Sequence, residues 1–321
     1  MLSLLELYAP VPDETLSPLP PDSHRGITAV TTFALFSLVA TAILFAHLLC
    51  RVLTWKRRTH GPVNPYVALL LNLVFADLQQ ALGFAFGIGW LKDDGIFAPD
   101  PMCWTQGWFL NAGDVASGLF TLAMAGHLFA DIVFDYRMAH CPLVAMIVGI
   151  WTLVYVLATI GVILHPQDFY MRAGIWCWIS ETYMPERLWL HYVWLLLTEF
   201  CVVILYTLMF VILWRRIRSF FYVSSENQLR AESAARTAIS YPIIYVVCTL
   251  PAVVTRLRIM TGRKASTEEL TFFGVMLTSS GWLDVLLYML TRRSLIAGPT
   301  IQNQDAHGLD TFQPWTQYRT D

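Results

Sequence analysis

Several acidic residues lie inside long apolar runs of this sequence, where an unpaired charge is unfavourable. A charged side chain at the centre of a bilayer costs about 3 kcal/mol or more unless a neighbouring helix or water meets it. Acids in such places are therefore candidates for functional sites. Two histidines occur in the same runs, and the full set is Asp77, Asp114, Asp131, Glu199, Asp284, His47 and His127.

Asp77 and Asp284 form one candidate polar network, together with Asn72 and Tyr288. Residues four apart share a helix face, so Asp284 and Tyr288 can point into one interior. A protonated or hydrated pair of Asp77 and Asp284 could act as a switch between two packings of the helices. The alternative is a satisfied structural network that only fixes the register of the helices. The sequence leaves both interpretations open.

A second candidate is a ligand site in the outer third of another apolar run. Aromatic walls around a few polar groups are typical of ligand sites between helices. Trp and Tyr near span ends also form interfacial belts, which is the alternative for each aromatic residue. Asp131 and His127 are expected to form a local hydrogen-bonded pair, and no metal or cofactor is expected. The candidate ligand-binding residues are Trp108, Asn111, Asp114, Trp178, His191 and Trp194.

The apolar runs that carry these residues predict an all-α membrane protein with a seven-transmembrane helix bundle. Of the 321 residues, 56% are hydrophobic and 14% are charged, whereas a soluble domain has about 25% charged residues. Runs of roughly 20 apolar residues indicate transmembrane helices, and the alternating segments of a β-barrel are not seen. The expected spans are 27–53, 66–90, 102–134, 142–164, 188–214, 236–257 and 269–293.

These spans divide the chain into three parts. Residues 1–26 are expected to be a disordered, Pro-rich extracellular tail, residues 27–290 the seven-transmembrane domain, and residues 291–321 a short cytoplasmic tail. The Lys and Arg residues are more numerous on one side of the spans, and basic residues resist translocation. That side is predicted to be cytoplasmic, which places the N-terminus outside and the C-terminus in the cytoplasm.

Cysteine and proline positions add two expectations. Cys103 and Cys177 both face the outside, where a disulfide can persist and would tie the loop 165–187 to the third span; the alternative is two free thiols. Pro242 and Pro251 each remove a backbone hydrogen bond, so the sixth span should kink and can pivot.

The inner loop before the sixth span mixes arginine with aromatic residues. It would place arginines at lipid headgroups or form a docking surface for a cytoplasmic partner.

Four segments carry a resemblance to a known family: NLVFADLQQALGF (72–84), CWTQGWFLNAGDVASGLFTLAMAGHLF (103–129), YPIIYVVCTLP (241–251) and GWLDVLLYMLTRR (281–293). With seven spans and the cysteine tether, they resemble G-protein-coupled receptors. More narrowly, they are similar to the fungal receptors related to cyclic-AMP receptors and to yeast glucose-sensing receptors. The resemblance covers about residues 27–293.

This resemblance implies a receptor, not an enzyme, in the plasma membrane. It would sense an unknown extracellular ligand, such as a sugar or a cyclic-nucleotide-like compound, and signal to the alpha subunit of a heterotrimeric G protein. The Asp135-Tyr136-Arg137 string does not match the Asp-Arg-Tyr lock of rhodopsin-type receptors, so that lock is not carried over. The expected G-protein-facing residues are Arg137, Arg215, Arg216, Arg218, Arg236, Arg292 and Arg293.

Other classes of membrane protein fit the sequence less well. A seven-helix transporter of a small solute is the main alternative, although no repeat relates the first three spans to the last three. A retinal protein needs a lysine in the seventh span, but Lys56, Lys92 and Lys264 all lie outside the spans. A metal hydrolase needs clustered ligands, and the histidines are scattered. The net charge of -2 gives no reason to expect nucleic-acid binding.

Overall fold

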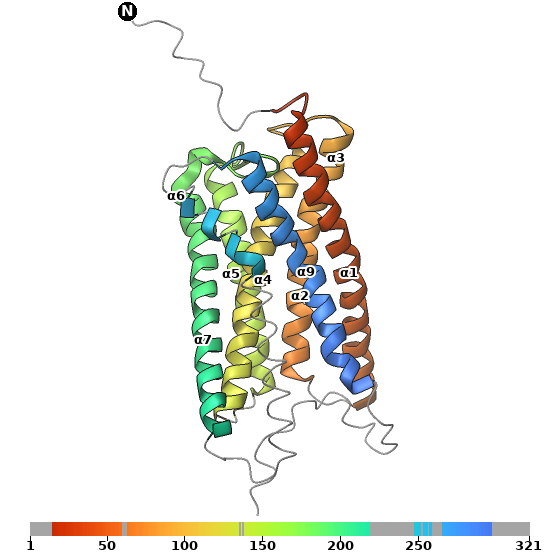
Figure 1. Ribbon diagram of the computed structural model, residues 1–321, viewed down its shortest axis with the longest axis vertical. Coiled ribbons are helices and arrows are strands. Elements are labelled where there is room, and N and C mark those ends of the chain that lie inside the picture. The colour runs from red at the N-terminus through yellow and green to blue at the C-terminus, as the bar shows by residue number, and fades with distance from the viewer. Residues whose placement is uncertain are drawn as a thin grey trace, which may run out of the picture.

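The computed structural model describes residues 15–59, 63–134, 136, 138–218, 247–251, 253–255, 257–258 and 265–296. Long helices dominate this part of the chain and run side by side along the long axis of the bundle (Figure 1). Further helical residues occur between 247 and 258. The long helices are α1 (Pro21–Thr59), α2 (Pro65–Ala85), α4 (Pro101–Phe134), α5 (His140–Leu164), α7 (Val193–Arg218) and α9 (Thr267–Ile296).

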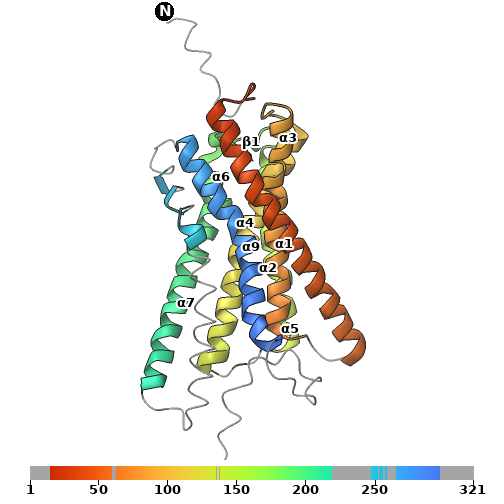
Figure 2. The same ribbon diagram turned by 45° about the vertical axis from the view of Figure 1, so that its right-hand side comes forward.

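One end of the bundle carries the short elements. We call these elements the cap, and this end of the bundle the capped end. Residues 15–20, α3 and the strands β1 and β2 lie there (Figure 2). The two strands pair antiparallel, with Met171 opposite Trp178. The short elements are α3 (Gly87–Lys92), β1 (Tyr170–Arg172), β2 (Cys177–Ile179), η2 (Glu181–Tyr183), α6 (Met184–Arg187) and the π-helical turn η3 (Leu188–Tyr192).

The long helices agree with the prediction of an all-α, multi-pass membrane protein. Within the described residues, 5 segments are long and apolar enough to cross a membrane: Pro21–Trp55, Pro65–Lys92, His140–Leu164, Glu181–Ile212 and Thr267–Leu290. Their outward faces carry large exposed apolar side chains such as Phe36, Ile163 and Phe200. Such faces are suited to lipid. Helix α4 has 34 residues, enough to extend about 50 Å.

The N-terminal region differs from the prediction of a disordered tail over residues 1–26. Helix α1 already begins at Pro21, and the residues before it are held against the loop after α3. Leu16 and Ile96 exchange two backbone hydrogen bonds of 2.9 Å, and Leu19 N donates to Asp94 Oδ1 at 3.3 Å. The prediction is therefore wrong for residues 15–26, whereas residues 1–14 lie outside the described part.

Helix α4 is the central element, because it packs against α2, α5, α7 and both strands. Its contact with α2 is close, and it depends on the absence of a side chain at Gly113. A Cβ atom there would lie 2.6 Å from the backbone nitrogen of Gln80. Two apolar clusters pack around α4, one at the capped end and one deeper in the bundle. This packing positions the polar side chains described next.

Candidate functional site

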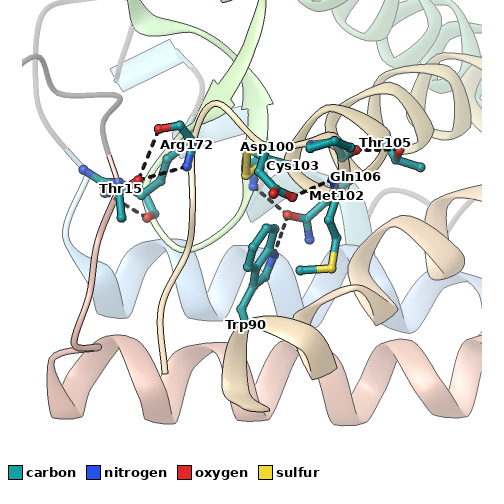
Figure 3. The surroundings of a disulfide bond; sticks show 12 residues. Thr15, Trp90, Asp100, Met102, Cys103, Thr105, Gln106 and Arg172 are labelled. Atoms are coloured by element: carbon teal, nitrogen blue, oxygen red, sulfur yellow. Dashed lines mark hydrogen bonds between the residues drawn. A yellow bond between two sulfur atoms is a disulfide. The ribbon is translucent and has the colours of Figure 1, made fainter. Parts of the chain in front are cut away.

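A disulfide fixes the cap to the bundle, as predicted. Cys103 in the first turn of α4 is bonded to Cys177 of β2, and their Cα atoms are 5.1 Å apart. Both residues are buried at the capped end (Figure 3). The bond holds the β1–β2 hairpin over the end of α4.

Gln106 reinforces this junction, and sequence reasoning did not find it. Its Oε1 accepts hydrogen bonds from Trp90 Nε1 at 2.9 Å and from Cys177 N at 2.8 Å. Its Nε2 donates to Gly83 O at 3.1 Å. The side chain therefore joins the end of α2, α3 and β2 (Figure 3). Its position three residues after Cys103, on the same helix face, is the signal that could have identified it.

A buried polar cluster lies below the cap, between α2, α4 and η3. Asp114 Oδ1 accepts from Gln80 Nε2 at 2.5 Å, and Asp114 Oδ2 lies 3.5 Å from His191 Nε2. His191 Nδ1 lies 2.7 Å from Asn111 Oδ1. Asn111 Nδ2 donates to Tyr170 OH at 3.1 Å, so its Oδ1 faces His191 as an acceptor. This arrangement assigns a proton to His191 Nδ1.

Tyr170 extends the cluster to β1 and α5. Its hydroxyl donates to Ala158 O at 2.8 Å. Burial raises the pKa of Tyr170 well above its usual value, and the hydrogen bond from Asn111 opposes this only in part. The hydroxyl therefore remains a donor. His191 belongs to a π-helical turn, a feature that is frequent at functional sites. Sequence reasoning missed Gln80 and Tyr170, which gave no signal of their own.

Four of the six predicted ligand-binding residues come together here: Asn111, Asp114, Trp178 and His191. The rings of Trp178 and His191 meet edge to face with centroids 4.7 Å apart, and Arg187 lies 5.0 Å from the centroid of Trp178. The exposed fractions are 6% for Asp114 and 0% for His191. The cap therefore closes the cluster to solvent in this structure.

The other two predicted ligand-binding residues lie elsewhere. Trp108 stacks on Tyr155 of α5, with ring centroids 5.6 Å apart and planes 3° apart. Trp194 Nε1 donates to Trp189 O at 3.0 Å. The structure thus separates the predicted set into a buried polar cluster and two tryptophans outside it.

Asp77 and Asp284 come together deeper in the bundle. Asp77 is 1% exposed and accepts from Ser117 Oγ at 2.8 Å, and the carboxyl groups of Asp77 and Asp284 interact electrostatically. Tyr288 is buried in the apolar cluster of this region.

Asn72 does not join this network. Its Oδ1 accepts from Trp151 Nε1 of α5 at 2.8 Å. Five residues along an α-helix correspond to a rotation of about 140° relative to Asp77, so the two side chains point to different neighbours. The inclusion of Asn72 in the predicted network is therefore corrected: it links α2 to α5.

The remaining predicted residues lie toward the opposite end of the bundle or in the sixth span. Arg215 is exposed at the end of α7, and Pro251 lies in the helical residues after 246. Arg216, Arg218, Arg292 and Arg293 are on described helix ends, but their side chains are not described. Arg137, Arg236 and Pro242 lie outside the described residues. In the described part, no group of three or more His, Cys, Asp or Glu side chains could hold a metal ion.

The fold and the site define a class of protein: a multi-pass helical membrane protein with a disulfide-held cap over a buried polar cluster. The family described as slime mold cyclic AMP receptor matches residues 91–274, more than half of the chain. The protein belongs to this receptor family. A comparison with curated proteins gave no match. The narrower grouping with fungal and glucose-sensing receptors is not supported by these comparisons and stays a prediction.

Proposed function

We propose that this protein is a seven-helix G-protein-coupled receptor for an extracellular ligand. The observation that carries the proposal is the family match, which runs from Leu91 at the end of α3 into α9. It includes the disulfide, the hairpin and most of the buried polar cluster. The family description favours a cyclic nucleotide as the first ligand to test, with a sugar as the second.

The topology that we propose follows from the disulfide and the helix directions. With the six long helices, the helical residues between 247 and 258 would complete a set of seven membrane spans. They would belong to the sixth span in chain order. A disulfide persists in an oxidising compartment, so the capped end would face the outside. The N-terminus would then lie outside and the C-terminus in the cytoplasm, with the protein in the plasma membrane.

The proposed mechanism is a shift between two populations of the bundle. A ligand that enters at the capped end would compete for hydrogen bonds of Asn111, Asp114 and His191, which connect α4 to η3, the turn that leads into α7. The carboxyl groups of Asp77 on α2 and Asp284 on α9 lie below this cluster and interact electrostatically. A change in packing at the first site could therefore reach the helix ends that would face the G protein, including Arg215.

Proximity measurements in living cells would test this function. The labelled receptor and each labelled Gα subunit of the host are followed while cyclic AMP, glucose or buffer is added. We expect a ligand-dependent change that disappears when Arg215, Arg216 and Arg218 are all replaced by Ala at equal surface level.

A response to glucose but not to cyclic AMP would move the ligand class to sugars. No change with any Gα subunit, together with solute flux in vesicles that contain the protein, would overturn the receptor function. That result would favour a transporter.

A further inference from the structure

Glu199 of α7 is an acid within the membrane span that the proposed function does not use. It lies on the partly buried side of the helix, since Leu197 and Phe200 are exposed while Thr198 and Val202 are buried. A carboxyl group at this depth is unfavourable unless other groups meet it. Its contacts therefore indicate why it is there.

Thr249 supplies one such contact from the sixth span. Its Oγ1 lies 3.0 Å from Glu199 Oε1 and 2.9 Å from Glu199 Oε2. The hydroxyl therefore donates to the carboxyl group, in a geometry shared between the two oxygens. This hydrogen bond joins α7 to the helical residues 247–251.

The turn that contains Thr249 is the one that Pro251 weakens. Proline has no N–H, so the carbonyl of Val247 loses its usual helical partner, and helices bend most easily at such a point. Val247 and Leu250 are exposed, whereas Cys248 is 1% exposed. One turn is therefore held by α7 through Thr249, and it packs into the bundle interior through Cys248.

We propose that the hydrogen bond between Glu199 and Thr249 holds this proline turn in the observed packing, and that its release lets the sixth span move to its signalling position. The second half of this proposal rests on the proposed receptor function. Glu199 and Thr249 are thus positioning residues, and neither is assigned to the ligand site.

Cys248 provides a direct probe of the turn, because the sequence has 6 cysteines. Cys103 and Cys177 form the disulfide, and replacing Cys50, Cys141 and Cys201 by Ser leaves Cys248 as the remaining thiol. In this background, purified protein in lipid nanodiscs is treated with N-ethylmaleimide, without ligand or G protein. The rate of Cys248 alkylation then measures how often the turn opens.

Thr249→Val removes the hydroxyl at nearly constant shape, and Thr249→Ser keeps it. We expect alkylation about fivefold faster in the valine variant, the factor that corresponds to ~1 kcal/mol for one hydrogen bond, and no change in the serine variant. Equal rates for the two variants would overturn the proposal.

Changes at Glu199 keep the test informative if Thr249→Val does not fold. Glu199→Met removes the acceptor and should also speed alkylation, whereas Glu199→Gln keeps an acceptor oxygen and should not. The double variant Glu199→Met with Thr249→Val should be no faster than either single change, since both break one contact. Multiplicative effects would show that the residues act separately and would refute the contact.

The signalling half has its own readout. In the cell assay, Thr249→Val should raise Gα proximity without ligand, and Thr249→Ser should not. Faster alkylation with unchanged ligand-free proximity would confine the contact to a structural role and overturn the signalling half. If no Gα subunit responds to any variant or ligand, the receptor function fails, and alkylation alone decides the contact.

Discussion

Gln80 of α2 donates a hydrogen bond of 2.5 Å to Asp114 of α4, and Asp114 in turn lies beside His191. One carboxyl group thereby connects three elements of the bundle. Replacing Asp114 by Leu would leave the amide of Gln80 without this acceptor in a buried site. We expect a loss of about 1–3 kcal/mol of stability, measured as a lower melting temperature in detergent.

Asp114→Asn is the matched control for this prediction, because its side-chain oxygen can still accept from Gln80. It should keep most of the stability. Equal melting temperatures for the Leu and Asn variants would contradict a stabilising role of the hydrogen bond.

Gly113→Ala should separate α2 from α4. The added Cβ would meet the backbone of Gln80 at 2.6 Å, and backbone cannot rotate away as a side chain can. Gly126 on the same helix has no neighbouring atom within 4 Å of the corresponding position. Gly126→Ala should therefore be neutral, or stabilising by about 0.5–1 kcal/mol through helix propensity. Melting temperatures of the two variants test this difference, and a similar fall in both would argue against close packing at Gly113.

Cys103→Ser and Cys177→Ser should lower surface level and melting temperature to similar extents. The disulfide closes a loop with a sequence separation of 74 residues, and the chain-entropy description assigns it up to about 4 kcal/mol. The double variant should be no worse than either single one, because each change breaks the same bond. A clearly additive double variant would contradict this expectation.

Asp284→Asn tests the role of the acid pair. It removes a carboxyl group that interacts with Asp77 while keeping a similar shape. If the pair is a switch, we expect altered G-protein signalling at a nearly normal surface level. Loss of surface expression with normal signalling per receptor would instead identify a structural network. Surface labelling and Gα proximity, measured in the same cells, distinguish the two.

The sequence was sufficient for the helices because apolar runs are local signals, and for the disulfide because these runs define a topology. Apolar runs of membrane length predict α4, α5 and α9 to within three residues at both ends, whereas α1 extends six residues beyond its expected span at each end. Cys103 and Cys177 are the pair that the expected topology places on one side. The ordered residues before α1 were missed because Leu16 is held by backbone pairing with Ile96, a distant contact that no local sequence pattern predicts.

The polar sites were predicted less completely, because helix rotation and loop placement decide which side chains meet. Asn111 and Asp114 share a helix face and could be grouped from their spacing. His191, predicted as an aromatic wall, instead forms a hydrogen bond with Asn111 and lies 3.5 Å from Asp114. Gln80 and Tyr170 come from other elements, and their role depends on how α2 and the β1–β2 hairpin pack. Asn72 was grouped with Asp77 from the sequence, but its position around α2 directs its side chain to Trp151 instead.

The pairing of Leu16 with Ile96 also limits how the protein can be shortened or tagged. Removing residues up to Pro20 would leave the backbone N–H and C=O of Ile96 without their hydrogen-bond partners. Asp94 Oδ1 would lose the hydrogen bond that it accepts from Leu19 N, and the apolar side chains that Leu19 covers would be exposed. Epitopes, fluorescent labels and protease sites therefore belong before Thr15. A deletion up to the start of α1 would remove the contacts that hold the loop after α3, which precedes Cys103 in the chain.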